Sequence, residues 1–200
     1  MIQAIADRRS IRKYKPDMVP KELIEKILEA GILAPSSKNR QPWRFVVASG
    51  EEKEKALAAM RQGLSREKEH PLIVKSAGLI AGAENTLRII EQAPVVIFIT
   101  NALGFEISLP LESEDRIAEI CNAQSIGAAI ENMTLAATDL GLGSLWISDT
   151  YFAYRELMEW LGTDKELFAA LAVGYAAESP SARPRKKMRD VVEWRGGALL

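Results

Sequence analysis

A cluster of basic side chains near the N-terminus is the first feature of this sequence that could do chemistry. The heptad Arg8-Arg9-Ser10-Ile11-Arg12-Lys13-Tyr14 places four cations and a hydroxyl within six positions. Guanidinium groups donate paired hydrogen bonds that match phosphate oxygens, and serine adds one more donor. Because the formal net charge of the whole chain is only −1, this positive charge is local. The heptad indicates either a phosphate-binding segment or a solvated basic segment, and taken alone it leaves both open.

A second polar stretch follows at residues 34–43, with the sequence Ala-Pro-Ser-Ser-Lys-Asn-Arg-Gln-Pro-Trp. Its prolines and small polar residues predict a loop. The side chains of Ser36, Ser37, Asn39 and Gln41 can each donate and accept hydrogen bonds. Such groups suit the edge of a heteroaromatic ring, where donors and acceptors alternate. The alternative interpretation is an ordinary capped turn.

Single residue types restrict the chemistry further. The chain has one histidine, His70, which argues against a histidine-based triad or a histidine-rich metal site. Its one cysteine, Cys121, rules out an intramolecular disulfide and fits a reducing cytosol. We expect His70 in a loop and Cys121 as a small buried group. We therefore expect no metal site and no catalytic side chain, and any difficult chemistry would need a cofactor.

The bulk composition is that of an ordinary globular protein. Of the 200 residues, 48% are hydrophobic and 26% are charged, which fits a single domain over residues 1–200. The near-zero net charge argues against nucleic acid as the main partner. We see no secretory segment and no apolar run that reaches the roughly 20 residues needed to span a bilayer. We therefore expect a cytoplasmic protein with no membrane partner.

Hydrophobic spacing predicts the elements that must position these residues. We expect helices at 2–9, 20–34, 51–61, 83–93, 114–140 and 154–161, and strands at 43–48, 95–100, 144–148, 168–177 and 190–194. Residues 62–82 have no clear pattern and could form a helix and a loop, and residues 101–113 are a candidate lid or pocket rim. Because helices and strands alternate irregularly, the sequence predicts an α+β fold and not a doubly wound sheet.

The long helix predicted at 114–140 is apolar on more than one face and rich in small residues. A helix of this kind is buried, inside its own domain or in an oligomer interface. One chain of 200 residues has few elements to cover it, so we expect a second copy and a two-fold homodimer. Gly141 stands where a left-handed residue commonly ends a helix.

The order and spacing of these features resemble the nitroreductase family of FMN-dependent flavoproteins. The most specific part is Ala34-Pro35-Ser36-Ser37-x-Asn39-x-Gln41-Pro42-Trp43. Further support comes from Gln124, Asn132-Met133, Ala136-Ala137, Leu140-Gly141-Leu142-Gly143 and Leu171-Ala172-Val173-Gly174-Tyr175. The resemblance extends over nearly the whole chain. It implies a central mixed or antiparallel sheet flanked by helices, in an intertwined homodimer whose C-terminal tail, about 180–200, could reach the partner subunit.

The resemblance also implies the residues that would bind non-covalent FMN. The phosphate, ribityl chain and pyrimidine edge would be held by Arg8, Ser10 and Arg12, with Arg9 adjacent. The phosphate clamp would be completed by Arg185 and Lys187, although Lys186 leaves the register open.

Two other stretches would contact the flavin ring. Pro35, Ser36 and Ser37 would reach it from the partner subunit, with Asn39 in support. Backbone N–H groups near Ile147 and Ser148 would face N5 and O4. Many relatives have glycine where this chain has Ser148, so the backbone geometry at this position is a point for the structure to decide.

The activity that the resemblance implies is hydride transfer from NAD(P)H, through flavin N5, to nitroaromatics, quinones or similar flat acceptors. Two alternatives share the fold: a specialised dehalogenase or metabolite dehydrogenase, and a protein that binds FMN without catalysis. A dinucleotide fingerprint at Gly141-Leu142-Gly143 is disfavoured, because these residues follow a helix and precede a strand, and Trp146 stands where the third glycine is required.

Overall fold

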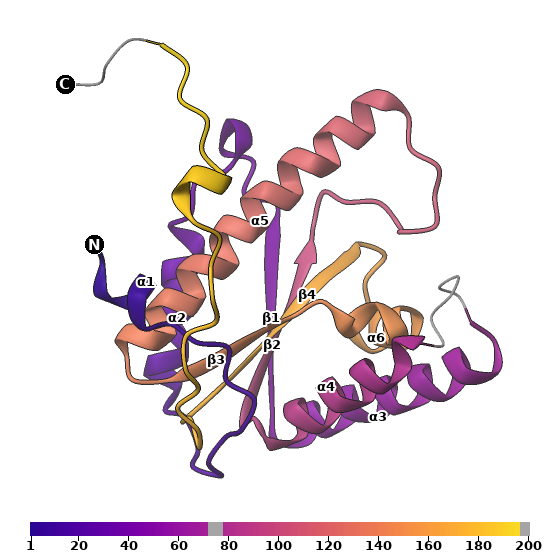
Figure 1. Ribbon diagram of the computed structural model, residues 1–200. Helices are drawn as coiled ribbons and strands as arrows, with labels where there is room; N and C mark the ends of the chain where they lie inside the picture. Colours follow the sequence, from indigo (N-terminus) through magenta and orange to yellow (C-terminus); the bar gives the residue numbers. More distant parts are fainter. Residues whose placement is uncertain (72–77, 197–200) are drawn as a thin grey trace.

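The computed structural model describes residues 1–71 and 78–196. Its centre is a four-stranded sheet with the spatial order β1-β2-β4-β3 (Figure 1). The strands are β1 (Trp43–Ser49), β2 (Val95–Asn101), β3 (Gly143–Ile147) and β4 (Glu166–Gly174). All three pairings are antiparallel. The expected α+β fold is confirmed, and the choice between a mixed and an antiparallel sheet is decided in favour of the antiparallel one.

Helices cover both faces of this sheet. They are α1 (Gln3–Asp7), α2 (Lys21–Ile32), α3 (Gly50–Glu69), α4 (Ile80–Gln92), α5 (Ser113–Asp139) and α6 (Tyr154–Leu161). Short 3₁₀ turns are η1 (Ser37–Asn39), η3 (Asp149–Ala153) and η4 (Met188–Asp190). Helices α2 and α5 pack on one face, and α3, α4 and α6 on the other, which gives three layers (Figure 1).

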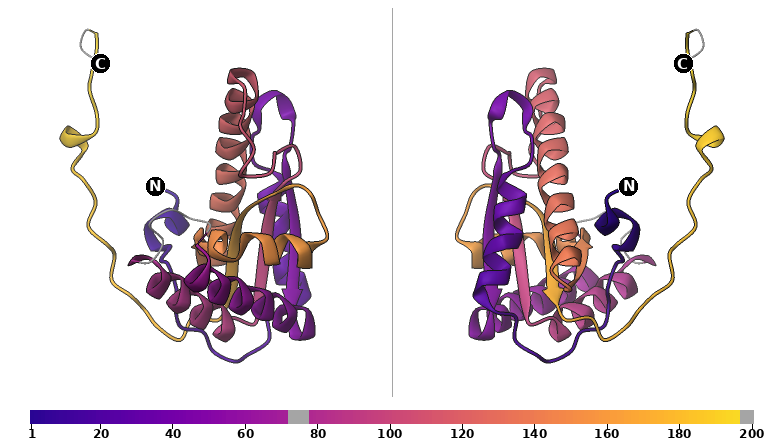
Figure 2. Two further views of the ribbon diagram at one scale, coloured as in Figure 1. Left: turned by 90° about the vertical axis from the view of Figure 1, so that its right-hand side faces the viewer. Right: turned by 90° about the vertical axis from the view of Figure 1, so that its left-hand side faces the viewer.

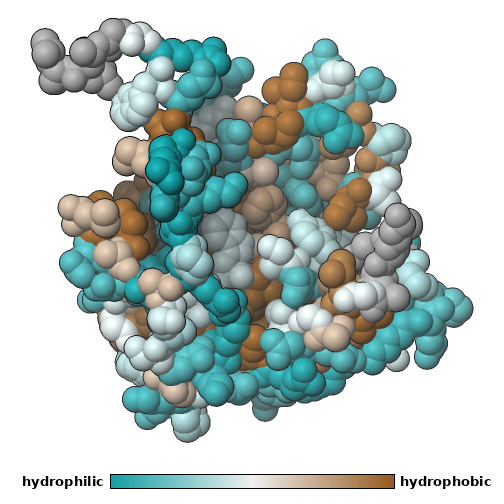
Figure 3. Space-filling model, viewed as in Figure 1, coloured by the Kyte–Doolittle hydropathy of each residue, from teal (hydrophilic) through white to brown (hydrophobic). Residues whose placement is uncertain are grey.

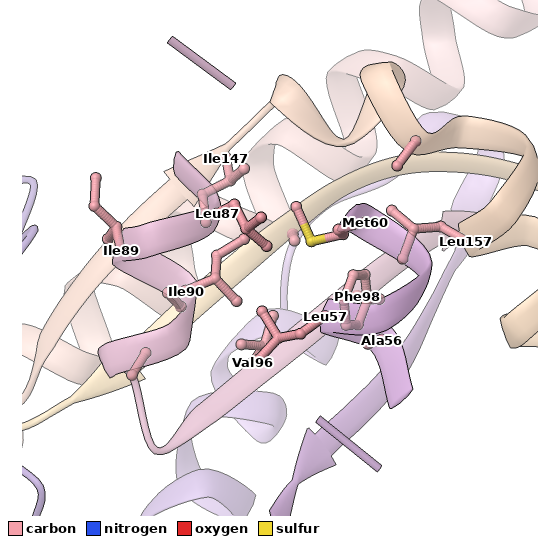
Figure 4. Packing of buried hydrophobic residues seen from close by; sticks show 14 of the residues in the cluster. Ala56, Leu57, Met60, Leu87, Ile89, Ile90, Val96, Phe98, Ile147 and Leu157 are labelled. Atoms are coloured by element: carbon pink, nitrogen blue, oxygen red, sulfur yellow. The ribbon is translucent and has the colours of Figure 1, made fainter. Parts of the chain in front are cut away.

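Strand β2 is buried along its whole length and divides the core in two. Side chains alternate across a strand, so Ile97 and Ile99 face the α2–α5 layer, whereas Val96 and Phe98 face α3, α4 and α6 (Figure 4). Because the strand is buried on both faces, its residues form a continuous apolar run, and this run predicted its position from the sequence.

The strand register brings several loops together at one end of the sheet. Trp43 pairs with Asn101, and Asn101 pairs with Glu166. Because β3 runs antiparallel to β4, β3 ends at Ile147 on the side of the sheet where β4 begins. The loop before β1, the segment after β2 and the turn after β3 therefore leave the sheet on the same side.

Several local predictions are confirmed. Helix α5 ends in a Schellman motif: the N–H of Gly141 donates to Thr138 O at 3.1 Å, and that of Leu142 donates to Ala137 O at 2.8 Å. Gly141 has a φ of 75°, which a glycine adopts without a Cβ penalty. His70 lies exposed just after α3, outside any regular element.

Other predictions need correction. Helix α3 continues past residue 61 to Glu69, because Leu64 and Glu67 are buried on its inner face. The uncertain stretch 62–82 is thus partly helical, while its residues 72–77 lie outside the described part of the chain. Strand β4 begins at Glu166 and ends at Gly174. Cys121 is half-exposed and not buried.

The prediction of a strand at 190–194 is wrong. Residues Met188–Asp190 form η4, and no strand follows within the described chain. The segment 178–196 first passes the N-terminal residues 5–12 and then extends away from the sheet (Figure 2), which leaves Met188, Val191 and Trp194 exposed. A strand needs a neighbouring strand to satisfy its hydrogen bonds, and this arm lies beside none.

Within the described ranges, no helix is both long and apolar enough to cross a membrane.

The core packing around Phe98 leads to a stability prediction. Phe98 is fully buried and meets the ring of Trp160 edge-on, with the ring centroids 5.0 Å apart. We expect Phe98→Ala to lower the free energy of unfolding by about 3–5 kcal/mol, because it leaves a cavity between β2 and α6. Urea unfolding would measure the loss. Val47→Ala, at a 43%-exposed position of β1, serves as the control and should change stability by less than about 0.5 kcal/mol. Equal losses in the two variants would contradict this account of the core.

Candidate functional site

A cavity of about 260 Å³ lies between the N-terminal heptad and the C-terminal arm. Its lining is dominated by arginine and contains no acidic residue. The lining residues are Ile5, Ala6, Arg8, Arg9, Ser10, Arg12, Pro180, Ser181, Ala182, Arg183 and Arg185. Two segments more than 160 residues apart in sequence thus contribute five guanidinium groups to one space.

Backbone pairing with β3 holds the heptad in place. Ser10 forms a parallel bridge with Ser144, and the Ile11 N–H donates to Ser144 O at 3.0 Å. Ile11 points into the core, whereas its neighbours Ser10 and Arg12 line the cavity, as the alternation of an extended chain requires. A Cβ on Gly143 would lie 2.8 Å from Ile11 Cγ1, so glycine at that position permits this close approach.

The second segment is joined to the heptad by a short ladder. The Lys15 N–H donates to Tyr175 O at 2.8 Å, and the Ala177 N–H donates to Lys13 O at 2.9 Å. The buried Tyr14 donates its hydroxyl to Ile11 O at 3.0 Å. Burial raises the pKa of Tyr14, with the Glu178 charge adding to the rise, so its hydroxyl remains a donor. The chain after β4 therefore leaves the sheet beside the heptad.

Two carboxylates lie beside the heptad, outside the cavity lining: Glu131 faces Arg8, and Glu178 accepts the backbone N–H of Arg12. Arg8 Nε lies 3.7 Å from Glu131 Oε1 of α5. Arg9 donates to the backbone oxygen of Ala6 at 2.7 Å, and Arg12 donates to that of Ser10 at 3.2 Å. Gathering like charges is costly unless an anion joins them, and charged hydrogen bonds to a phosphate would satisfy the guanidinium donors. The geometry therefore fits an anionic ligand.

The C-terminal arm contributes differently from what the sequence suggested. Arg185 lines the cavity as expected and also donates to Arg183 O at 3.2 Å. Lys187 is exposed immediately before η4 and does not line the cavity. Sequence reasoning missed Arg183 and Ser181. The basic run at 183–189 could have indicated Arg183. An irregular arm has no period, however, so the sequence does not show which of its side chains face the cavity.

The loop that contains Pro35–Asn39 is anchored on α5. The Ser37 N–H donates to Ser125 Oγ at 3.2 Å, and the Ser125 hydroxyl donates to Cys121 O at 2.7 Å. Ser36 Oγ accepts the Gln41 N–H at 3.0 Å. Lys38, Asn39 and Gln41 all have positive φ, so the loop holds an uncommon backbone conformation that the capping hydrogen bonds stabilise. Pro35, Ser37 and Asn39 are exposed.

The heptad and this loop contact different sides of α5 within one chain. The heptad meets the helix at Glu131, and the loop meets it at Ser125. Six residues of helix separate these positions by about 9 Å along the axis and by about a third of a turn around it. The two sets of predicted ligands therefore attach to α5 at different heights and on different sides of the helix.

The last predicted contact lies at the end of β3. Ile147 is buried, and Ser148 is exposed directly after it. Ser148 has a φ of −104°, a conformation open to any L-residue, so this position does not require glycine. The next residue, Asp149, accepts the Thr86 hydroxyl at 2.7 Å, which ties the turn to α4. From Ser144, beside the heptad, to Ile147, β3 spans about 10 Å and links the cation-lined cavity with this turn.

Among the described residues, no group of three His, Cys, Asp or Glu side chains could hold a metal ion.

These features define a class of protein: a three-layer α+β fold with an arginine-lined cavity built from the N-terminal heptad and the segment after the last strand. The profile of the Nitroreductase family matches residues 5–175, and the chain belongs to this family. A relative from Methanothermobacter thermautotrophicus, provisionally named NADH dehydrogenase/NAD(P)H nitroreductase, is 30% identical over 188 residues, which cover 92% of this chain and 81% of the relative. A Bacillus subtilis protein named FMN reductase [NAD(P)H] is 28% identical and is matched over 92% of this chain and 69% of its own length.

Solved structures agree on the fold. A BluB-like flavoprotein from Clostridium difficile 630 superposes with a TM-score of 0.80 at 28% identity, covering 97% of this chain and 98% of that one. The FMN-dependent nitroreductase NfnB from Mycobacterium smegmatis, solved with NADPH, superposes with a TM-score of 0.75 at 20% identity, covering 96% of each chain. The resemblance inferred from the motifs is therefore confirmed at the level of family and fold.

The lining of the cavity predicts which basic residues of the arm bind an anion and which only face solvent. We expect Arg185→Gln and Arg183→Gln each to weaken pyrophosphate binding roughly tenfold, since a hydrogen bond to a charged group contributes about 1.5–3 kcal/mol. Lys187→Gln should change binding by no more than about twofold, because Lys187 lies outside the lining. The shift of the thermal unfolding midpoint with added pyrophosphate measures each affinity. A larger loss in Lys187→Gln than in Arg185→Gln would contradict this register.

Proposed function

We propose that this protein is an FMN-dependent NAD(P)H oxidoreductase that reduces flat acceptors such as nitroaromatics and quinones. The observation that carries the proposal is the acid-free cavity with five arginines, formed at the heptad of a chain that belongs to the nitroreductase family. Relatives named as an FMN reductase and as an FMN-dependent nitroreductase solved with NADPH support the choice of cofactor and donor.

The chain's residues fit a flavin mononucleotide. Arg8, Arg9 and Arg12 would hold the phosphate from one side, and Arg185 from the other, while the Ser10 hydroxyl supplies a further donor. The backbone at Ile147 and Ser148 lies at the other end of β3, where a ring system extending from that phosphate would arrive. Pro35, Ser36, Ser37 and Asn39 would line the ring, and Lys187 would add long-range positive charge.

In this proposal the protein contributes orientation and charge. Bound FMN would supply the redox chemistry, which is acceptance of a hydride from NAD(P)H and its donation to the acceptor. In the net reaction NAD(P)H is oxidised to NAD(P)⁺, and a two-electron acceptor gains one hydride equivalent and one proton taken up from solvent. Heptad cations that reach the pyrimidine edge would stabilise negative charge on the reduced cofactor. No acid–base side chain is required.

We further propose a homodimer in which two chains build each site. Ile117 and Ile120 of α5 are 62% and 52% exposed, and the arm carries Trp194 exposed at 69%. These apolar surfaces need a cover, and a second copy related by a two-fold axis supplies one. The separation of the loop 35–39 from the heptad around α5 supports a loop that serves the partner's flavin and a heptad that serves its own.

Flavin binding and turnover test the proposed activity together. The protein should purify yellow and release FMN on heating, since nothing in the site implies a covalent link. With NAD(P)H and a quinone, double-reciprocal plots should give parallel lines, because donor and acceptor would use one flavin in turn. A colourless protein that ignores added FMN would overturn the proposal. Intersecting lines in an FMN-loaded enzyme would reject only the alternating use of one slot.

Complementation tests the shared site. Arg12→Glu should repel the phosphate, and Ser37→Trp should block the crossing loop, so each variant homodimer should lose FMN from both sites. A mixed dimer would carry one site with both defects and one with neither. Differently tagged mixed dimers should therefore recover up to half of the normal FMN content, with matching activity. Mixed dimers that recover no FMN, although both variants fold and dimerise, would show that one chain supplies both residues.

A further inference from the structure

Strand β3 carries one exposed side chain. Of its five residues, Gly143, Ser144, Leu145 and Ile147 are buried, whereas Trp146 is 39% exposed. Tryptophan has the largest apolar area of any side chain to bury, and leaving that area in water forgoes its burial energy. An exposed indole on an otherwise buried strand therefore indicates a surface that another molecule covers.

Trp146 lies on the face of the sheet that α5 covers. Its neighbours Leu145 and Ile147 belong to the core on the other face, so the alternation of a strand directs Trp146 toward α5. A Cβ on Gly127 of α5 would lie 3.7 Å from Trp146 Cη2, which is at the far edge of the indole. The ring is thus held at its Cβ by the strand and at its far edge by the helix.

The side of α5 that meets the indole also meets the N-terminal heptad. Glu131 lies four residues after Gly127, so the two residues are on one side of the helix. Glu131 Oε1 lies 3.7 Å from Nε of Arg8, which lines the arginine-lined cavity. One helical turn, about 5.4 Å, thus separates the contact with Trp146 from the contact with the heptad.

The path of β3 gives the same placement independently. Ser144 forms the bridge with Ser10 of the cavity lining. Trp146 stands two residues further, about 7 Å along the strand, and the exposed Ser148 follows directly after the strand. Trp146 therefore lies on the stretch between the cavity and the turn at Ser148, along which a cofactor held by its phosphate would extend.

An indole in this position suits a flat aromatic ligand. Within residues 1–71 and 78–196, the aromatic rings pair as Phe98 with Trp160 and Tyr151 with Tyr154, so Trp146 has no ring partner in the described chain. Aromatic rings prefer offset stacking, which joins an electron-rich face to an electron-poor ring. Indole has an electron-rich face, and the oxidised isoalloxazine ring of a flavin is electron-poor.

We propose that Trp146 is a cofactor-binding residue whose indole stacks on the isoalloxazine ring of FMN. The position of Trp146 depends only on the described contacts, whereas the identity of the ring rests on the proposed function. The negative face of the indole disfavours added electron density on the stacked ring. Trp146 would thus favour the oxidised cofactor and oppose the heptad cations, which favour the reduced one.

A second copy of the chain is the alternative cover for this indole. The exposed Ile117 and Ile120 belong to the start of α5, and Figure 3 shows apolar surface at the upper right, where residues 102–112 and the start of α5 lie. Gly127 lies seven residues beyond Ile120, about 10 Å along the helix. Trp146 is therefore closer to the heptad than to this apolar surface, which favours a ligand of the cavity over a partner subunit.

Affinity measurements on the full-length protein test the contact. Trp146→Leu should weaken FMN binding about tenfold, and Trp146→Phe, which keeps an aromatic face, by no more than about threefold. Riboflavin has the same ring but no phosphate, so Trp146→Leu should weaken riboflavin binding by the same factor. Arg185→Gln is the matched comparison and should weaken the binding of FMN but not that of riboflavin. A loss in Trp146→Leu that is confined to FMN would overturn the contact with the ring.

Flavin fluorescence is a readout that a purely structural role would not change. A stacked indole gives an electron to the excited ring and recovers it without emission, so FMN bound to the unsubstituted protein should be strongly quenched. Trp146→Phe should restore emission at full saturation, because a phenyl ring does not donate that electron. The reduction potential of the flavin should rise in Trp146→Leu.

Trp160→Phe is the matched control. It removes one indole from the opposite face of the sheet, where Trp160 meets Phe98, and should leave the emission of bound FMN unchanged. Equal emission in Trp146→Phe and the unsubstituted protein would overturn the stacking. Normal flavin binding in Trp146→Leu, together with a weaker dimer in sedimentation velocity, would assign the indole to the partner subunit instead.

Turnover separates this inference from the proposed function. If Trp146 variants lose quenching and affinity but the FMN-loaded protein does not oxidise NAD(P)H with a quinone, the proposed activity fails while the stacking stands. If turnover is normal and the variants bind and quench FMN like the unsubstituted protein, only the stacking fails. A protein that binds no FMN would overturn both.

Discussion

Electrostatic repulsion among the arginines of one cavity is the constraint around which much of this structure is arranged. Five guanidinium groups lie around a space of about 260 Å³ with no acidic residue in its lining. Such a cluster is stable only if the backbone holds it together and an anion or solvent screens it. The backbone does so through the Ser10–Ser144 bridge and the ladder between 13–15 and 175–177. The arginine-lined cavity is thus a consequence of how both ends of the chain attach to the sheet.

The sheet also separates two kinds of polar chemistry. At the Gly143 end of β3, five arginines of the heptad and the arm line the cavity, and Glu131 and Glu178 lie beside the heptad. At the other end of the sheet, Asn101 is hydrogen-bonded to Glu166, and burial raises the pKa of that carboxyl group to about 7. The proposed FMN, with an anionic tail and a flat, less polar ring, would match this arrangement.

Helix α5 connects these two regions. Its Glu131 meets the heptad, its Ser125 anchors the loop at Ser37, and its Glu119 accepts the backbone N–H of Phe105 in the segment after β2. Because one helix contacts all three segments, a change in what packs against α5 would affect all three segments together. The exposed Ile117 and Ile120 indicate that this cover is incomplete in a single chain.

Local patterns in the sequence were sufficient for most of the fold. The buried run of β2, the amphipathic α2 and the glycine that ends α5 each follow from residues close together in the chain. The motifs at 8–14 and 34–43 pointed to the family, which the comparisons confirm. The predicted strand at 190–194 failed because β-propensity alone supplies no partner strand, and α3 was predicted too short because its last turns are stabilised by packing.

Only the tertiary structure decided which distant groups meet. Spacing along the chain could not show that Arg183 lines the cavity and Lys187 does not, because an irregular arm has no period that fixes its side-chain directions. Nor could it pair Glu166 with Asn101, because their proximity depends on the strand register of β2 and β4. The sequence by itself determined the residue types available for chemistry and the elements that carry them. The tertiary structure determined their mutual distances and, through burial, raised the pKa of Glu166, because a pKa depends on neighbours that only folding brings together.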